Sequence, residues 1–166
     1  MTAARRRDEI LQALAGASGP VSAAALAARL GVSRQVVVGD VALLRAAGSP
    51  IVATPRGYVL GGGQEGGGVR CTVACRHGLD GLLDELYTVA DCGCGVLDVT
   101  VEHPVYGQLS GQLQVFSRYD ADVFWDALQK NGAQPLCSLT GDIHLHTLLC
   151  PDEARRDAAL GALRAL

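Results

Sequence analysis

Two histidines separated by one residue carry the clearest chemical signal in this chain. His144 and His146 lie in an apolar run between Gly141 and Pro151. On a β-strand, side chains two residues apart point to the same face, so the two imidazoles would project together. Two converging neutral imidazoles supply half of the donors of a transition-metal site. The alternative is a polar strand face in contact with solvent.

Three more side chains extend the metal hypothesis. His77 follows an apolar segment and Glu85 lies on an expected helix, and imidazole and carboxylate donors together suit Zn²⁺ or Ni²⁺. The remaining histidine, His103, could bond a small ligand or brace the site from behind. The alternatives are that His77 is a loop residue in contact with solvent and that Glu85 lies on a solvent-exposed helix face. His103 could likewise be a structural histidine whose hydrogen bonds are made within the protein. The full candidate metal-ligand set is His77, Glu85, His144 and His146.

The six cysteines are interpreted mostly as small buried hydrophobic residues. The charged N-terminus lacks the apolar segment of a signal peptide, and no apolar run reaches the roughly 18 residues of a membrane helix. We therefore expect a cytoplasmic protein without a membrane partner, in which disulfides are rare. Cys92 and Cys94 lack the two-residue gap of common zinc knuckles, and no second such pair accompanies them. The cysteines are Cys71, Cys75, Cys92, Cys94, Cys137 and Cys150.

The charge is divided unevenly along the chain. Residues 1–60 hold seven arginines against three acidic residues, a net charge of +4. Residues 61–166 hold seven basic and fourteen acidic residues, a net charge of −7. Although the whole chain carries −3, this division favours a basic nucleic-acid-binding module joined to an acidic partner domain.

The first sixty residues show the pattern of a winged helix-turn-helix. Ser22 and Ser33 are good N-caps for two helices, and Gly31 lies in the three-residue turn between them. Helix, glycine-containing turn and helix is the spacing of a helix-turn-helix, and two short β runs around a Pro/Gly turn would form the wing. The expected elements are helices over residues 5–15, 23–30 and 34–47 and strands over residues 51–54 and 58–60.

The third of these helices is expected to read DNA. In a helix-turn-helix, the N-terminal residues of the second helix of the pair contact base edges in the major groove. Arg34 can pair with guanine and Gln35 with adenine, while Val38 could meet a thymine methyl group. Arg56 at the wing tip would reach a phosphate or the minor groove. The alternative is a module that binds protein. The candidate DNA-binding residues are Ser33, Arg34, Gln35, Val38 and Arg56.

A glycine-rich linker and an α+β domain complete the chain. Six of the eight residues in 61–68 are glycine, a composition typical of flexible linkers. We therefore expect a winged helix-turn-helix domain at residues 1–60 and an α+β domain at residues 69–166. The element order β-α-β-β-α-β-β-α predicts an antiparallel or mixed sheet with helices on one face. The expected strands are residues 69–74, 96–101, 109–116, 136–139 and 143–149, and the expected helices are residues 79–90, 118–130 and 151–166.

Several motifs distributed over both halves of the chain occur together in one known family. They are residues 33–38, Asp40 and residues 50–54, then residues 77–78, 101–107, 144–147 and 151–153. The first group resembles the winged helix of the niacin-responsive transcriptional repressors, and the second resembles their three-histidine (3H) regulatory domain. The similarity extends from Arg6 to Leu163, while Gly39 departs from the longer polar or basic residue that is more usual there.

The resemblance implies a repressor, not an enzyme, that acts on genes of NAD biosynthesis or niacin uptake. It implies a homodimer on double-stranded operator DNA, nicotinic acid as co-repressor, and a nickel or zinc ion at the residues matching His77, Glu85, His144 and His146. Arg118 is the candidate partner of the nicotinate carboxylate, since guanidinium–carboxylate pairs are strong; its alternative is an exposed surface residue. The alternative functions are a repressor that senses the metal itself and a metal-dependent hydrolase.

Overall fold

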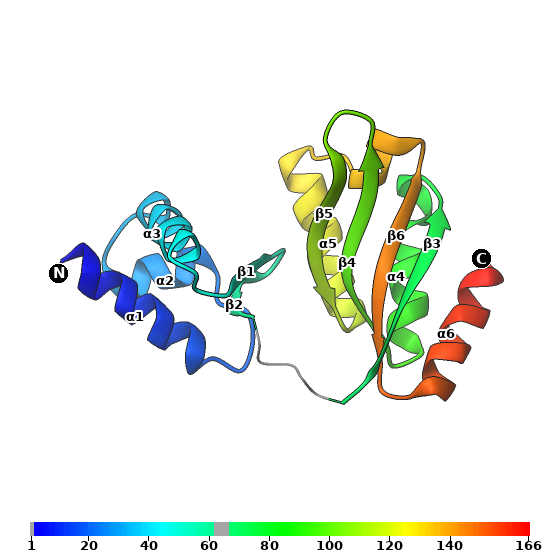
Figure 1. The fold of residues 1–166 in the computed structure, drawn as a ribbon, viewed down its shortest axis with the longest axis horizontal. Helices are drawn as coiled ribbons and strands as arrows, with labels where there is room; N and C mark the ends of the chain where they lie inside the picture. Colours follow the sequence, from blue (N-terminus) through cyan, green and yellow to red (C-terminus); the bar gives the residue numbers. More distant parts are fainter. Residues whose placement is uncertain (1, 62–66) are drawn as a thin grey trace. The chain divides into compact units, whose positions relative to one another are not determined.

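The structure, a computed structural model, describes residues 2–61 and 67–166. The chain divides into two compact units, residues 1–66 and 67–166, which are considered separately (Figure 1). The glycine-rich stretch predicted at residues 61–68 falls at this junction, and its residues 62–66 lie outside the described residues. Within the described ranges, no helix is both long and apolar enough to cross a lipid bilayer.

The first unit contains three helices followed by a β-hairpin. Ser22 and Ser33 cap the second and third helices, because their hydroxyls accept hydrogen bonds from Ala25 N and Val36 N. Gly31 takes a φ of 65° after the second helix, a conformation that glycine adopts without steric cost. The predicted caps and turn are therefore confirmed. The elements are α1 (Ala3–Ala15), α2 (Ala23–Leu30), α3 (Arg34–Ala46), β1 (Ile51–Thr54) and β2 (Gly57–Leu60).

One apolar core holds the first unit together. Val37 and Val41 of α3 are buried in it, as the helical spacing predicts. β1 and β2 pair antiparallel to form the predicted hairpin, and Val21 is joined to it by a bridge to Tyr58. Burial of one side of α3 leaves its other side, including its N-terminal turn, exposed.

The second unit is built on a four-stranded antiparallel sheet. The strand order is β3-β6-β4-β5, and every neighbouring pair is antiparallel. Ser117 caps α5 and Gly132 ends it with a φ of 57°, as their residue types predict. The elements are β3 (Val69–Arg76), η1 (Leu79–Gly81), α4 (Leu82–Asp91), β4 (Gly95–His103), β5 (Gly107–Val115), α5 (Arg118–Asn131), η2 (Leu136–Thr140), β6 (Ile143–Cys150) and α6 (Glu153–Arg164), where η marks a short 3₁₀ helix.

Helices α4, α5 and α6 cover one face of this sheet (Figure 1). α4 contacts both other helices, α5 contacts β5, and α6 contacts β3 and β6. The helices share one apolar core with strand residues such as Val96, Val115 and Leu148. Along β6, His144, His146 and Leu148 are buried while the residues between them are not. Both histidines therefore point toward the helix-covered face, which confirms the α+β class and the two-residue spacing argument.

The hairpin predicted from residues 136–139 and 143–149 is wrong. The first of these segments forms η2, in which Ser138 N donates a hydrogen bond to Pro135 O. β6 is already paired on both edges, with β3 and β4, so no place beside it is left for another strand. Gly141 and Asp142 turn the chain into β6 with φ values of 63° and 69°. The segment Leu136–Leu139, with apolar residues at three of its four positions, does not distinguish a strand from a 3₁₀ helix by sequence alone.

Candidate metal centre and DNA-binding surface

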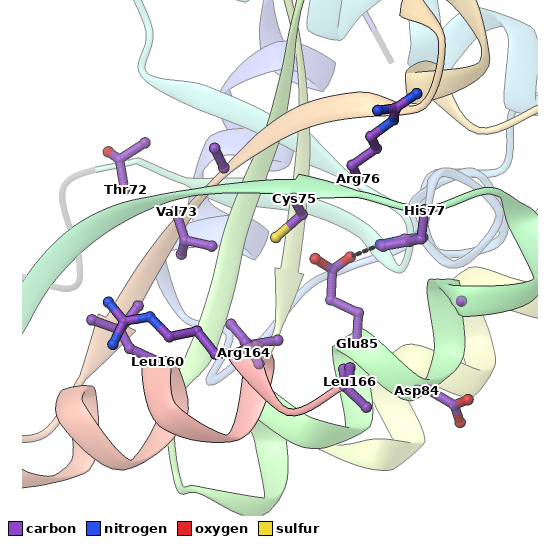
Figure 2. Close-up of a pocket in the computed structure, with 13 residues that line it drawn as sticks. Thr72, Val73, Cys75, Arg76, His77, Asp84, Glu85, Leu160, Arg164 and Leu166 are labelled. Atoms are coloured by element: carbon purple, nitrogen blue, oxygen red, sulfur yellow. Dashed lines mark hydrogen bonds and ion pairs between the residues drawn. The ribbon is translucent and has the colours of Figure 1, made fainter.

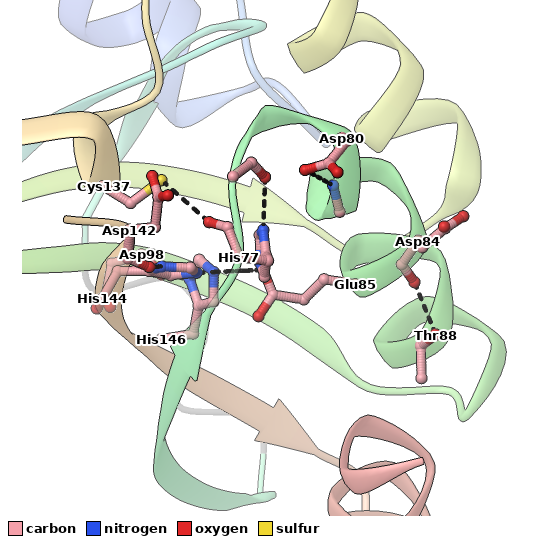
Figure 3. Close-up of polar contacts among 12 residues, drawn as sticks. His77, Asp80, Asp84, Glu85, Thr88, Asp98, Cys137, Asp142, His144 and His146 are labelled. Atoms are coloured by element: carbon pink, nitrogen blue, oxygen red, sulfur yellow. Dashed lines mark hydrogen bonds and ion pairs between the residues drawn. The ribbon is translucent and has the colours of Figure 1, made fainter. Parts of the chain in front are cut away.

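Three histidines converge on one carboxylate oxygen in the second unit. His77 directly follows β3, His144 and His146 lie on β6, and Glu85 lies in the first turn of α4. The Nε2 atoms of His77, His144 and His146 lie 2.6, 3.3 and 3.2 Å from Oε2 of Glu85. Figure 2 shows the contact between His77 and Glu85, and Figure 3 shows the two β6 histidines beside them. The structure thus brings together all four members of the candidate ligand set.

The other ring nitrogens fix the orientation of the three imidazoles. In each ring Nδ1 faces a backbone carbonyl oxygen, at 2.6 to 3.0 Å. Because a carbonyl only accepts, each Nδ1 carries a proton, and a neutral ring then presents a lone pair at Nε2. Such a lone pair can bind a metal ion, whereas an Nε2 that carries a proton of its own can donate a hydrogen bond to Glu85 Oε2. The carbonyls that face His77, His144 and His146 are those of Gly78, Asp142 and Asp98.

The geometry and burial of this cluster fit a divalent transition metal. Donors around a tetrahedral ion with bonds of about 2.0–2.1 Å lie roughly 3.4 Å apart, close to the distances from His144 and His146 to Glu85. Glu85 is 2% exposed, and its second oxygen, Oε1, has no hydrogen-bond partner among the described residues. A buried carboxylate oxygen without a partner is costly, so the site is incomplete in terms of protein groups alone.

The surroundings of Glu85 favour its charged form. Burial opposes ionisation, but hydrogen bonds with His144 and His146 and the attraction to His146 outweigh burial and hold the pKa of Glu85 well below its usual value. The carboxylate is therefore an anion at neutral pH, which is the form that binds metal.

Cys75 is a neighbour of the cluster that was interpreted from the sequence as a small hydrophobic residue. Its Sγ, a carboxylate oxygen of Glu85 and a ring nitrogen of His144 all lie within 4.8 Å of one another. Cys75 is half-buried on β3 and pairs with His144 across the sheet. Burial and the neighbouring Glu85 carboxylate raise the pKa of its thiol. The strand predicted from the sequence ends at residue 74, so the prediction did not place Cys75 on the face of the sheet that carries the cluster. All six cysteines are free thiols.

His103 and Arg118 lie apart from this cluster. Two cavities flank the histidines, and neither His103 nor Arg118 lines either of them. His103 Nδ1 accepts hydrogen bonds from two backbone amides of the turn that follows it, so His103 braces the connection from β4 to β5. The Arg118 guanidinium donates to both carboxylate oxygens of Asp91 and lies 4.6 Å from the ring centroid of Tyr87. Arg118 is thus already engaged by an acid of its own unit.

In the first unit, the predicted base-reading residues lie around the exposed start of α3. Arg34 and Gln35 are exposed, whereas the hydroxyl of Ser33 serves as the helix cap. Val38 is half-buried and packs against the core. Arg56 lies in the turn between β1 and β2, at the tip of the wing. Arg34 and Gln35 are therefore the predicted base-reading residues whose side chains are exposed at this helix start.

Comparisons with known proteins agree with this two-part architecture. Residues 70–166 match the 3H domain family, and residues 6–59 match an HTH domain. The chain is 42% identical over 159 residues to the probable transcription repressor NiaR of Thermotoga maritima. It is 41% identical over 162 residues to the transcription repressor NadR of Bacillus subtilis, and each alignment covers 96% of this chain and 90% of the relative. The chain belongs to the NiaR/NadR-type family of transcription repressors.

As a NiaR/NadR-type repressor the protein binds DNA, yet part of its N-terminal positive charge has a structural use. Arg6 Nε donates to the carboxylate of Asp40, and Arg7 Nη1 lies 3.5 Å from the same group. Asp40 is buried on the inner side of α3, so this contact fastens α1 to α3. Arg5 is paired with Glu9 on α1. Three of the seven arginines in residues 1–60 are therefore engaged by acids of the same unit.

Proposed function

We propose that this NiaR/NadR-type repressor controls genes of NAD biosynthesis or niacin uptake and that nicotinic acid is its co-repressor. In this proposal a homodimer places two winged helices on double-stranded operator DNA. The second unit holds a nickel or zinc ion, and nicotinate binds beside it. The site serves sensing and not catalysis, in keeping with relatives that are named repressors.

The observation that carries the proposal is the convergence of three imidazole Nε2 atoms on Glu85 Oε2. When bound there, a divalent ion supplies positive charge and a coordination position for a ligand nitrogen or oxygen. His144 and His146 are 2% and 5% exposed, whereas His77 is 21% exposed. A small molecule would therefore reach the cluster from the His77 side.

Binding of nicotinate has to be coupled to the DNA-binding units. The effector raises operator affinity only if it binds one arrangement of the dimer more tightly than another. A coupling free energy of about 1–3 kcal/mol would raise that affinity about 5–150-fold. We expect an effect in this range for nicotinate at saturating metal.

The test is a fluorescence-anisotropy titration of a labelled duplex taken from the promoter of the protein's own gene. Nicotinate, nicotinamide and the metal are varied separately. We expect tighter operator binding with nicotinate and metal together. His144→Ala combined with His146→Ala should retain basal DNA binding and lose the nicotinate response. Thr147→Ala is the matched control, since Thr147 lies on the opposite face of the same strand.

Other results would replace parts of the proposal. Operator binding that follows metal concentration without nicotinate would identify a repressor that senses metal. Hydrolysis of a small ester or amide that stops on metal removal would reveal an enzyme. An absence of heat on titrating nicotinate into the metallated protein at millimolar concentration would remove nicotinate as the effector.

A further inference from the structure

A cavity of about 580 Å³ opens beside the histidine cluster (Figure 2). Its volume lies within the range of about 300–1,000 Å³ that is usual for small-molecule sites. It lies between β3, the start of α4 and the C-terminal half of α6. One end is polar and belongs to the cluster, with Cys75, His77 and Glu85. The apolar residues that line it include Val73, Leu160 and Leu163.

Arg164, in the last turn of α6, also lines this cavity. It forms no hydrogen bond or ion pair with any other residue that the structure describes. In contrast, Arg118 is held by Asp91, and Arg156 by Asp157. Figure 2 shows Arg164 on the same side of β3 as Glu85.

Arg76 is the other arginine at the edge of the cavity. Figure 2 shows its side chain on the opposite side of β3 from Glu85. The strand pattern agrees, because Arg76 belongs to the exposed positions of β3 that alternate with Cys75. Arg164 is therefore the cation that faces the cavity, while Arg76 faces away from it.

We propose that this cavity binds a small aromatic monocarboxylate whose carboxylate pairs with Arg164. The inference rests on the proposed function, since it assigns a place and a recognition residue to the nicotinate of that proposal. The aromatic ring would lie against Val73, Leu160 and Leu163, with its far edge toward His77 and Glu85. Guanidinium groups suit this role because they bind a carboxylate with two parallel hydrogen bonds.

The charge of Arg164 also distinguishes an acid from its amide. A carboxylate can pair with the guanidinium through charge-assisted hydrogen bonds, whereas a neutral carboxamide cannot. We therefore expect nicotinate to bind more tightly than nicotinamide, which lacks the charge.

The test is isothermal titration calorimetry of the full-length, metal-loaded protein with nicotinate, nicotinamide and benzoate. Arg164→Ala should weaken nicotinate binding about tenfold or more and leave nicotinamide binding unchanged. Arg164→Lys should restore part of the affinity, since it keeps the charge but not the fork of donors. Arg76→Ala is the matched control that removes an equal charge from the other side of β3. Metal affinity, measured separately, should be the same in all variants.

The outcomes separate this inference from the proposed function. If the nicotinate Kd of Arg164→Ala is within twofold of the wild-type value, the role proposed for Arg164 is wrong, while nicotinate remains the effector. If the wild type binds benzoate but not nicotinate, and Arg164→Ala abolishes that binding, the effector is wrong and the carboxylate site stands. If the wild type binds neither acid, both are overturned. A loss of metal affinity in Arg164→Ala would show that the residue supports the fold of the cluster and would also overturn the inference.

Discussion

Metal should stabilise the second unit strongly, and Glu85→Gln should remove most of that gain. Glutamine keeps the shape of the side chain but lacks the negative charge that three imidazole nitrogens surround. Glu85 is 2% exposed, so water cannot easily take the place of the lost carboxylate oxygen. The variant therefore tests whether the charge at this position is needed to hold a cation.

The expected magnitude follows from linkage between binding and folding. A metal present at about 100 times its Kd stabilises the folded state by about 2.7 kcal/mol. For a unit the size of residues 67–166, 1 kcal/mol corresponds to about 4–8 °C, so the Tm should rise by about 11–22 °C. If Glu85→Gln weakens metal binding about 100-fold, the gain at the same concentration falls to roughly 0.4 kcal/mol, or about 2–3 °C.

Trp125 makes the assay specific for this unit. It is the single tryptophan of the chain and packs against the core of the second unit, so its fluorescence follows the unfolding of that unit. Untagged protein is stripped with a chelator and melted with and without added zinc or nickel. Glu102→Gln, at an exposed position on β4, is the matched control and should keep the full shift. An equal shift in Glu85→Gln and wild type, or no shift in wild type, would refute the reasoning.

Three shorter predictions concern α3 and the cluster. Arg34→Ala should weaken specific operator binding by about 1–3 kcal/mol and relax base choice at one position, whereas an equal loss on unrelated DNA would assign Arg34 to a phosphate. Gly39→Ala, with open space around the added methyl group, should stabilise the first unit by about 1 kcal/mol in calorimetry, and an unchanged or lower Tm would contradict this. Cys75→Ala should lower affinity for Cd²⁺ more than for Mn²⁺ in competition titrations, because thiolate prefers soft ions, and equal losses would exclude Cys75 as a donor.

The features predicted well from the sequence are those set by local physics. Ser33 and Gly31 fix the turn before α3 through a side-chain cap and a left-handed φ, and neither depends on distant parts of the chain. The alternation along β6 placed His144 and His146 on one face for the same reason. The proximity of these histidines to His77 and Glu85 is different, because no spacing rule links residues that lie 59 to 69 positions apart. The sequence predicts it only through the chemistry of the donor groups and the resemblance to a known family.

The features that were missed depend on how the elements pack. Whether residues 136–140 form a strand is decided by β6, whose two edges are occupied by β3 and β4. From the sequence, Arg118 is expected to bind a ligand carboxylate or to lie exposed, but α4 ends beside the start of α5 and supplies Asp91 to it. No sequence pattern around Arg164 marks it as a candidate binding residue, because its position matters only through the cavity that α6 forms with β3. Asp40 is likewise buried at a position where α1 brings Arg6 to it, which the sequence of α3 alone does not show.

The location of the cluster indicates what a bound cation does to the fold. Its histidines come from the sheet and the residue that follows β3, and its carboxylate comes from α4. A cation among them would therefore join the helix layer to the sheet at a polar point, where apolar packing does not hold the two layers together. Without it, the buried Oε1 of Glu85 has no hydrogen-bond partner among the described residues, and α4 would pack less firmly at its N-terminal end. The cavity beside His77 is bounded by the same end of α4 and by α6. A ligand there would therefore bind to a surface that the metal first makes rigid, which predicts that nicotinate affinity depends on metal even if the ligand never touches the ion. Nicotinate binding of equal strength in stripped and metallated protein would exclude this coupling.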